Sequence, residues 1–176
     1  MGKRISYWLV PAETDGEVLA EIMCDLAGWI IDAPIFDPHV TLYSGPFGAT
    51  DNVPAILESA TRGLSEITLR STGLAHSAQF TKTLFVEFAP DEMLSQISTA
   101  LKEQSSQLGD YELKPHLSLV YANLSTEVRE HFARQKSVPP RVRFDRVRAI
   151  LSQGPTHTRE DVDAWRVVAE RWLDGS

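Results

Sequence analysis

Cysteine is almost absent from this chain of 176 residues, in which Cys24 is the single one. An internal disulfide is therefore excluded, and the apolar neighbours of Cys24 predict a buried free thiol. No apolar run approaches the roughly 20 residues that a transmembrane helix needs. The N-terminal stretch also lacks the small-residue cleavage site of a signal peptide. We therefore expect a cytoplasmic protein that does not associate with membranes.

Basic residues are also in deficit, with 17 Lys and Arg against 24 Asp and Glu, which gives a formal net charge of −7. Proteins that grip long nucleic acids through the phosphate backbone need a basic surface, so the charge balance argues against that class. It does not exclude a small phosphorylated ligand, because a local site can be positive on an acidic protein. One stretch, 129–148, is rich in arginine, and we interpret it as a solvated helix and strand face rather than an RNA-binding track.

Hydrophobic residues make up 43% of the chain, which is enough for a packed core. Apolar periodicity and turn residues predict strands at 5–12, 39–45, 65–71, 83–89, 115–121 and 141–152, and helices at 15–29, 50–64, 91–108 and 125–135. Thr14 and Glu17 have the form of a capping box for the first helix. The inward parity of the last strand shifts between Phe144 and Val147, which predicts a bulge. The turn-rich residues 71–82 show no clear strand or helix pattern, and the pattern of residues 162–173 fits either a strand or a helix.

The order strand–helix–strand–helix–strand occurs twice, which indicates an internal repeat. Its spacing is regular: His39 follows Trp8 by 31 residues, and His116 follows Phe85 by 31 residues. We therefore predict an α+β protein in which residues 1–176 form one bilobal domain. Each pseudo-symmetric lobe would be an antiparallel sheet with helices on its outer side, and a cleft would separate the two sheets.

Two five-residue segments share one pattern, PHVTL at 38–42 and PHLSL at 115–119. Side chains two positions apart in a strand point to the same face. His39 should therefore project with Thr41, and His116 with Ser118, while the aliphatic neighbours turn to the core. If the two sheets face each other, two imidazoles and two hydroxyls surround one point.

Such a set suits displacement at phosphorus, in which a base deprotonates the attacking oxygen and an acid protonates the leaving oxygen. Histidine has an ordinary pKa of about 6.5, so one copy can be neutral and another cationic near neutral pH. The hydroxyls can donate to the non-bridging phosphate oxygens. This arrangement requires no metal, and the sequence leaves open which histidine is the base. His76, His131 and His157 lack the motif, and we expect them at the surface.

The chain resembles the 2H phosphoesterases, which are named for two motifs of this kind. Further stretches, SYWLVPAE, KPHLSLVYANLSTE and DAWRVV, make it most similar to the cyclic phosphodiesterases of the plant and yeast type, over nearly the whole chain. The resemblance implies a bilobal fold with a water-filled cleft. It also implies metal-independent opening of ADP-ribose 1″,2″-cyclic phosphate and of nucleoside 2′,3′-cyclic phosphates, the latter to 2′-phosphates, without a cofactor. We expect a monomer.

The resemblance also assigns roles to residues. It makes the two histidines the acid–base pair and the two hydroxyls the phosphate-binding groups, and it implies substrate contacts by four side chains: Tyr121, Trp8, Phe80 and Lys82. Phe80 could stack on a base and Lys82 could attract phosphate, although either could equally be an ordinary loop residue. Trp8 could equally belong to the core.

Three alternatives stay open. The first is an RNA-end enzyme of the same superfamily, which makes or breaks 2′–5′ linkages and uses 129–148 to hold RNA. The second is a non-catalytic nucleotide-binding module, against which the two complete motifs argue. A zinc hydrolase is the most remote, because no histidine pair has the helix spacing of a metal site. The expected partner is a small cyclic-phosphate nucleotide, an ADP-ribose derivative or an RNA end.

Overall fold

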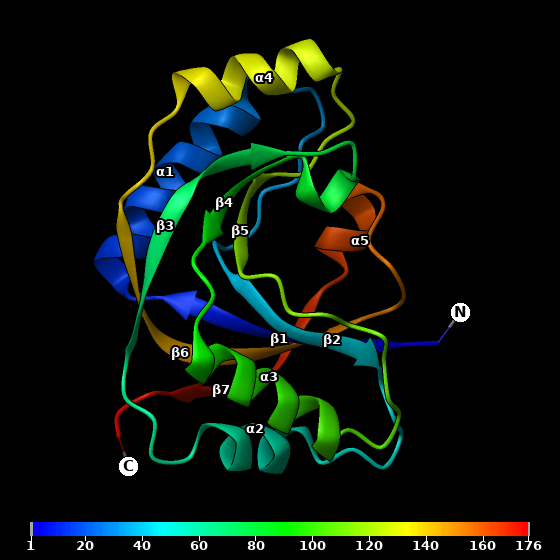
Figure 1. Ribbon diagram of the computed structural model, residues 1–176. Helices are drawn as coiled ribbons and strands as arrows, with labels where there is room; N and C mark the ends of the chain where they lie inside the picture. The colour runs from blue at the N-terminus through cyan, green and yellow to red at the C-terminus, as the bar shows by residue number, and fades with distance from the viewer. Residues whose placement is uncertain (1, 176) are drawn as a thin grey trace.

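The computed structural model describes residues 2–175 and alternates strands with helices along the chain (Figure 1). The strands are β1 (Arg4–Pro11), β2 (Val40–Pro46), β3 (Ile67–His76), β4 (Leu84–Phe88), β5 (His116–Val120), β6 (Arg141–Ser152) and β7 (Arg166–Trp172). The helices are α1 (Glu13–Gly28), α2 (Val53–Thr61), α3 (Glu92–Gln104), α4 (Thr126–Gln135), the short α5 (Arg159–Asp163) and a 3-10 turn at Phe80–Lys82. The predicted α+β class is confirmed.

All seven strands belong to one antiparallel sheet in the order β1-β2-β5-β4-β3-β6-β7, with β1 also paired to β6. The two halves of the chain, β1–β3 and β4–β6, exchange strands within this sheet. In each half the first two strands pair with each other, β1 with β2 and β4 with β5. The third strand of each half pairs with the first strand of the other, β3 with β4 and β6 with β1. The repeat in the sequence is therefore also a repeat in strand pairing.

The two halves meet again where β2 reaches β5. A single register pair, Val40 opposite Leu117, joins these strands. Both residues are fully buried, and each directly follows a histidine in the chain. The histidines of the two motifs are thus drawn together by the sheet itself.

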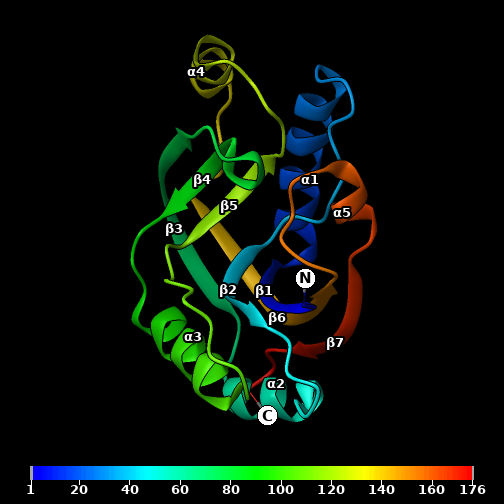
Figure 2. The same cartoon turned by 90° about the vertical axis from the view of Figure 1, so that its right-hand side faces the viewer.

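The longer helices surround the strands. Figure 2 shows α4 at one end of the molecule, α2 and α3 at the other, and α1 running alongside the strands. α1 packs on β5 and β1, and α3 packs on β2 and on α2. The helices cover the apolar faces of the strands against which they pack. This arrangement buries a core that includes Tyr7, Leu19, Tyr43 and Phe144.

Side chains cap two of the helices, and the bulge predicted in the long strand is confirmed. Asn52 caps α2 by accepting from the Ala55 amide at 3.3 Å, and Ser125 caps α4. The bulge in β6 falls at Asp145, because Val10 pairs with Arg146 while Pro11 pairs with Phe144.

Other local predictions are wrong. Helix α1 begins at Glu13 after Ala12, so Thr14 and Glu17 form no capping box there. Asp15 instead accepts from the backbone amide of Arg143 at 2.6 Å, a contact from a distant strand that the local pattern does not contain. Cys24 is exposed rather than buried, because α1 turns Leu19, Met23 and Leu26 to the core.

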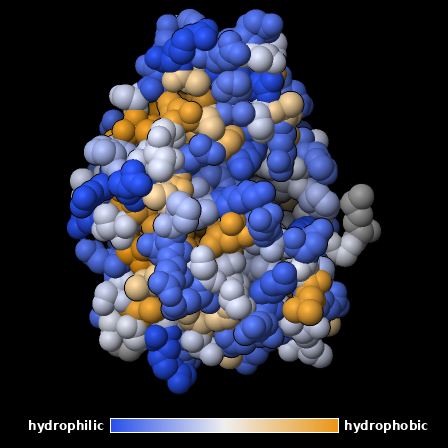
Figure 3. Space-filling view, viewed as in Figure 1, coloured by the Kyte–Doolittle hydropathy of each residue, from blue (hydrophilic) through white to orange (hydrophobic). Residues whose placement is uncertain are grey.

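The two ambiguous segments each combine strand and helical structure. Residues 71–82 hold the end of β3 and the 3-10 turn, and residues 162–173 hold the end of α5 and all of β7. On the face shown in Figure 3, hydrophobic residues appear as separate patches among hydrophilic ones.

Candidate active site

A cleft of about 410 Å³ lies against β1, β2, β5 and β6 and the loop before α5. His39, Thr41, His116 and Ser118 all line it. The prediction that both motifs face one space therefore agrees with the geometry. None of its lining residues is Asp or Glu, although the chain carries 24 acidic side chains.

His39 is held from two directions. Its Nδ1 lies 2.7 Å from the carbonyl oxygen of Asp37, and Trp8 stacks on its ring with centroids 3.6 Å apart and planes 9° apart. A carbonyl can only accept, so Nδ1 carries the proton and Nε2 is the nitrogen left for the cleft. Only 6% of His39 is exposed.

His116 repeats this arrangement. Its Nδ1 lies 2.6 Å from the carbonyl oxygen of Lys114, again two residues earlier in the chain. Phe85, the counterpart of Trp8 in the repeat, meets its ring edge-on with centroids 5.5 Å apart. The proline of each motif favours the extended backbone that lets the histidine reach back to this carbonyl. The spacing of 31 residues in the sequence thus corresponds to a repeated aromatic–histidine contact.

The two hydroxyls differ in their contacts. Ser118 Oγ donates to the carbonyl oxygen of Thr81 at 2.8 Å. Within residues 2–175, the Thr41 hydroxyl has no hydrogen-bond partner in the protein, while its carbonyl accepts from the Tyr111 hydroxyl at 2.8 Å. Thr41 is therefore ready to donate to a ligand, whereas Ser118 would have to turn from Thr81 to do so.

Burial lowers the pKa of both histidines. For His39, desolvation is the main cause, His116 adds to it, and the pKa falls to about 4. For His116 the pKa is lowered by desolvation first and by Lys82, while the Lys114 carbonyl and Glu87 oppose the shift. The direct influence of His116 on His39 is consistent with two imidazoles that share one cleft. Both rings are therefore neutral in the free protein at pH 7.

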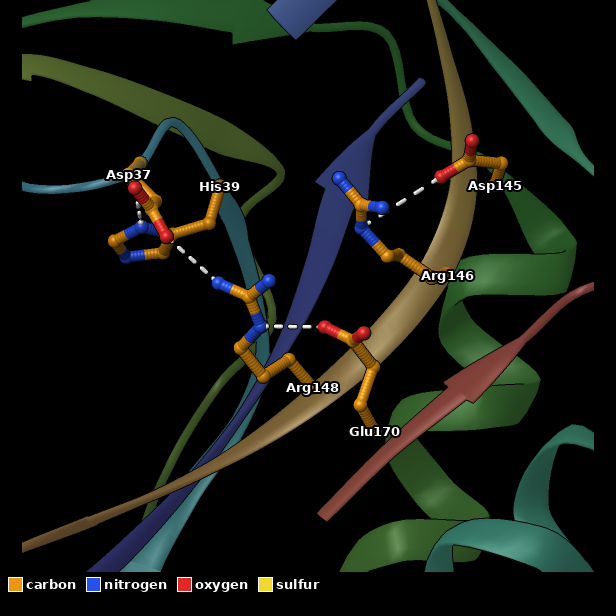
Figure 4. Close-up of polar contacts among 6 residues, drawn as sticks. All are labelled: Asp37, His39, Asp145, Arg146, Arg148 and Glu170. Carbon is orange, nitrogen blue, oxygen red and sulfur yellow. Dashed lines mark hydrogen bonds and ion pairs between the residues drawn. The ribbon is translucent and has the colours of Figure 1, made fainter. Parts of the chain in front are cut away.

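An arginine that no motif in the sequence marks stands behind His39 (Figure 4). Arg148 Nη1 lies 2.7 Å from the Asp37 carboxylate, and its Nε lies 2.7 Å from Glu170. Because the Asp37 carbonyl accepts from His39, the chain Glu170–Arg148–Asp37 fixes the peptide that orients the imidazole. The neighbouring Arg146 turns instead to Asp145.

The four predicted substrate contacts separate into two pairs. Trp8 and Tyr121 line the cleft and are nearly buried, at 6% and 5% exposed. Trp8 is occupied by His39, while Tyr121 stacks on Phe36 with centroids 4.0 Å apart. Burial strongly raises the pKa of Tyr121.

Phe80 and Lys82 lie outside the lining of this cleft. Phe80 borders a neighbouring groove beside Tyr121, and Lys82 lies over the Phe85 ring, 4.5 Å from its centroid. Gln79 and Thr81, the alternate residues of the same segment, line the cleft instead. The turn at 80–82 determines which side chains face inward, and no periodicity in the sequence marked it.

Sequence reasoning also missed the wall formed by the segments on either side of α5. Trp165 meets Trp8 edge-on at 5.0 Å between ring centroids, and Thr156 accepts from its indole nitrogen at 3.3 Å. His157 is exposed, as expected, yet it stands at the rim of the cleft. His131 is exposed, while His76 is half-buried in β3.

Residues 2–175 contain no group of three or more His, Cys, Asp or Glu side chains placed to hold a metal ion. No helix in that range has both the length and the apolar character to cross a bilayer.

The sheet and the twin motif place the chain in the 2H phosphoesterase class, which confirms the resemblance seen in the sequence. The family model described as cyclic phosphodiesterase-like protein matches residues 1–173, and the chain belongs to this family. Membership indicates a phosphoesterase. A comparison with curated protein sequences gave no significant match.

Solved structures support the fold. Apo LigT from E. coli is 15% identical, with a TM-score of 0.58 and 98% of each chain covered. TT0787 of Thermus thermophilus is 14% identical, with a TM-score of 0.61 and 97% of each chain covered. Usb1 from Kluyveromyces marxianus is 10% identical, with a TM-score of 0.50 and 98% of each chain covered. At these identities the likeness concerns the fold alone.

Proposed function

We propose that this protein is a metal-independent cyclic phosphodiesterase that hydrolyses nucleoside 2′,3′-cyclic phosphates, ADP-ribose 1″,2″-cyclic phosphate, or both. The observation that carries the proposal is the pairing of His39 and His116 in one cleft without a carboxylate. Structures of E. coli LigT with 3′-AMP and with NADP⁺ are known for that protein. They support a nucleotide as the ligand class here. The bilobal division belongs to the same proposal. Each lobe would combine the first two strands of one half of the chain with the third strand of the other half.

In the proposed reaction, His39 Nε2 removes a proton from a water molecule, whose oxygen attacks the phosphorus. The bond from phosphorus to one ribose oxygen breaks, and protonated His116 gives its proton to that oxygen. The product is a phosphate monoester beside a free hydroxyl, and proton exchange with solvent restores both rings. Thr41 and Ser118 donate to the non-bridging oxygens as negative charge develops on them.

The assignment of base and acid rests on the different surroundings of the two rings. His39 is the more deeply buried, and its pKa of about 4 keeps it neutral and ready to accept a proton. His116 is less buried, and Glu87 opposes the lowering of its pKa. A bound phosphodiester anion would raise the pKa of His116 further and favour its cationic form.

The RNA-end alternative receives less support from the charges. An RNA-binding track needs free cations, yet most basic residues of 129–148 are paired with acidic side chains: Arg134, Lys136, Arg143, Arg146 and Arg148. Arg129 is buried, with 7% of it exposed.

The test is turnover of adenosine 2′,3′-cyclic phosphate by purified protein in EDTA, with the product identified by phosphorus NMR. We expect His39→Ala and His116→Ala each to lower kcat/KM by several orders of magnitude. His131→Ala, which removes an exposed histidine on α4, should leave it unchanged. Retained activity in both single variants of the motif would overturn the proposal, and calorimetric binding without any turnover would favour the non-catalytic alternative.

A further inference from the structure

The cleft extends along β1 beyond the two motifs to a polar end. Alternate residues of β1, namely Arg4, Ser6 and Trp8, face the cleft, as the two-residue period of a strand requires. Trp8 lies opposite Thr41 of β2, and Ser6 lies opposite Ser44. With a rise of about 3.3 Å per residue, Arg4 stands about 13 Å along the strand from Trp8.

Arg4 has no acidic partner in residues 2–175. Its Nη2 makes a long hydrogen bond of 3.5 Å to Ser44 Oγ, and Ser6 Oγ donates to the same oxygen at 2.8 Å. The cleft around it contains no carboxylate, on a chain with a net charge of −7. This region therefore combines a cation without a counter-ion and two hydroxyls.

A guanidinium with adjacent hydroxyls matches the oxygens of a phosphoryl group, because its donors form a planar fork and its charge is permanent. The catalytic end of the cleft, with Trp8 and the two histidines, would hold the cyclic phosphate and its ribose. A nucleoside 2′,3′-cyclic phosphate without further groups would leave the Arg4 end unused. A phosphoryl group on the 5′-oxygen leaves the ribose from the edge opposite the cyclic phosphate and can extend along β1.

We propose that Arg4, assisted by Ser6 and Ser44, binds a second phosphoryl group of the substrate, attached through the 5′-oxygen of the ribose that carries the cyclic phosphate. The inference rests on the proposed function and narrows its substrate to small nucleotides phosphorylated at both edges of this ribose. A 5′-monophosphate and a 5′-diphosphate share this chemistry. A cleft of about 410 Å³ fits a ligand of nucleotide size.

The experiment compares kcat/KM for adenosine 2′,3′-cyclic phosphate with that for the same compound bearing a 5′-phosphate or a 5′-diphosphate. We expect the wild-type protein to prefer one of the two phosphorylated substrates, and the better one identifies the natural group. In Arg4→Gln this preference should fall about tenfold, the effect of one charge-assisted contact at a partly exposed site. Lys3→Gln removes the same charge from the adjacent exposed residue outside the cleft lining and should keep the wild-type preference.

An unchanged preference in Arg4→Gln, or an equal loss in Lys3→Gln, would overturn the inference. The inference would also be overturned if both the wild type and Arg4→Gln preferred an oligoribonucleotide with a cyclic phosphate end to every mononucleotide. Calorimetric binding of adenosine 2′,5′-bisphosphate and adenosine 2′-phosphate tests the subsite without turnover. Tighter binding of the bisphosphate that is lost in Arg4→Gln supports the subsite even if no cyclic phosphate is hydrolysed, so failure of the proposed function is distinguishable from failure of the subsite.

Discussion

The buried imidazole of His39 should make the stability of this protein depend on pH in a measurable way. In the folded protein the His39 pKa is about 4, whereas in an unfolded chain it is about 6.5. At a pH between these two pKa values, the unfolded chain binds a proton at His39 that the folded protein does not bind. Acid therefore favours unfolding: the contribution of His39 to stability is complete above pH 6.5 and is lost as the pH falls toward 4.

The magnitude follows from the two pKa values. Each unit of difference corresponds to about 1.4 kcal/mol once the pH lies below the unfolded value. From pH 7 to pH 5, His39 alone should lower the free energy of unfolding by about 2 kcal/mol. This is a large fraction of the roughly 5–15 kcal/mol that is typical of globular domains.

The assay is urea unfolding at pH 7 and at pH 5 for the wild type and for His39→Gln, which removes the titrating group and keeps a polar side chain. The loss of stability between the two pH values should be about 2 kcal/mol greater in the wild type. The same pH dependence in both proteins would refute the argument that burial depresses this pKa. It would also remove the reason for assigning His39 as the base.

Two further predictions concern the support of the site and the packing beneath it. Arg148→Gln breaks the ion pairs behind His39, so we expect kcat to fall on the order of tenfold with KM unchanged. Partial recovery in Arg148→Lys would distinguish positioning from folding, and full activity in Arg148→Gln would contradict it. In Gly45→Ala, the new Cβ would lie 2.3 Å from the Tyr43 hydroxyl, so the free energy of unfolding should fall by about 2 kcal/mol. Gly28→Ala, where a Cβ meets nothing within 4 Å, is the control, and equal stability of the two variants would argue against the clash.

Patterns along the chain were enough to predict the α+β class, most element positions and the two histidine–hydroxyl pairs. Local rules were sufficient for these, because a strand presents alternate side chains to one face and a cap or a bulge is visible in a few neighbouring residues. The 31-residue spacing even paired each histidine with the aromatic ring that contacts it. The same local rules failed at Thr14 and Glu17, because α1 already begins at Glu13 and Thr14 lies inside the helix.

The other side chains that reach the cleft are selected by the packing of the strands. Arg4 joins the lining of the cleft because β1 lies between β2 and β6, and Arg148 supports the peptide that orients His39 because β6 brings it beside Asp37, 111 residues away along the chain. Thr81 lines the cleft while its neighbours Phe80 and Lys82 do not, because a single 3-10 turn rotates them away. These contacts join residues far apart in the sequence, and no periodicity of a single segment encodes them. The depressed pKa of His39 likewise arises from burial, which exists only in the folded protein.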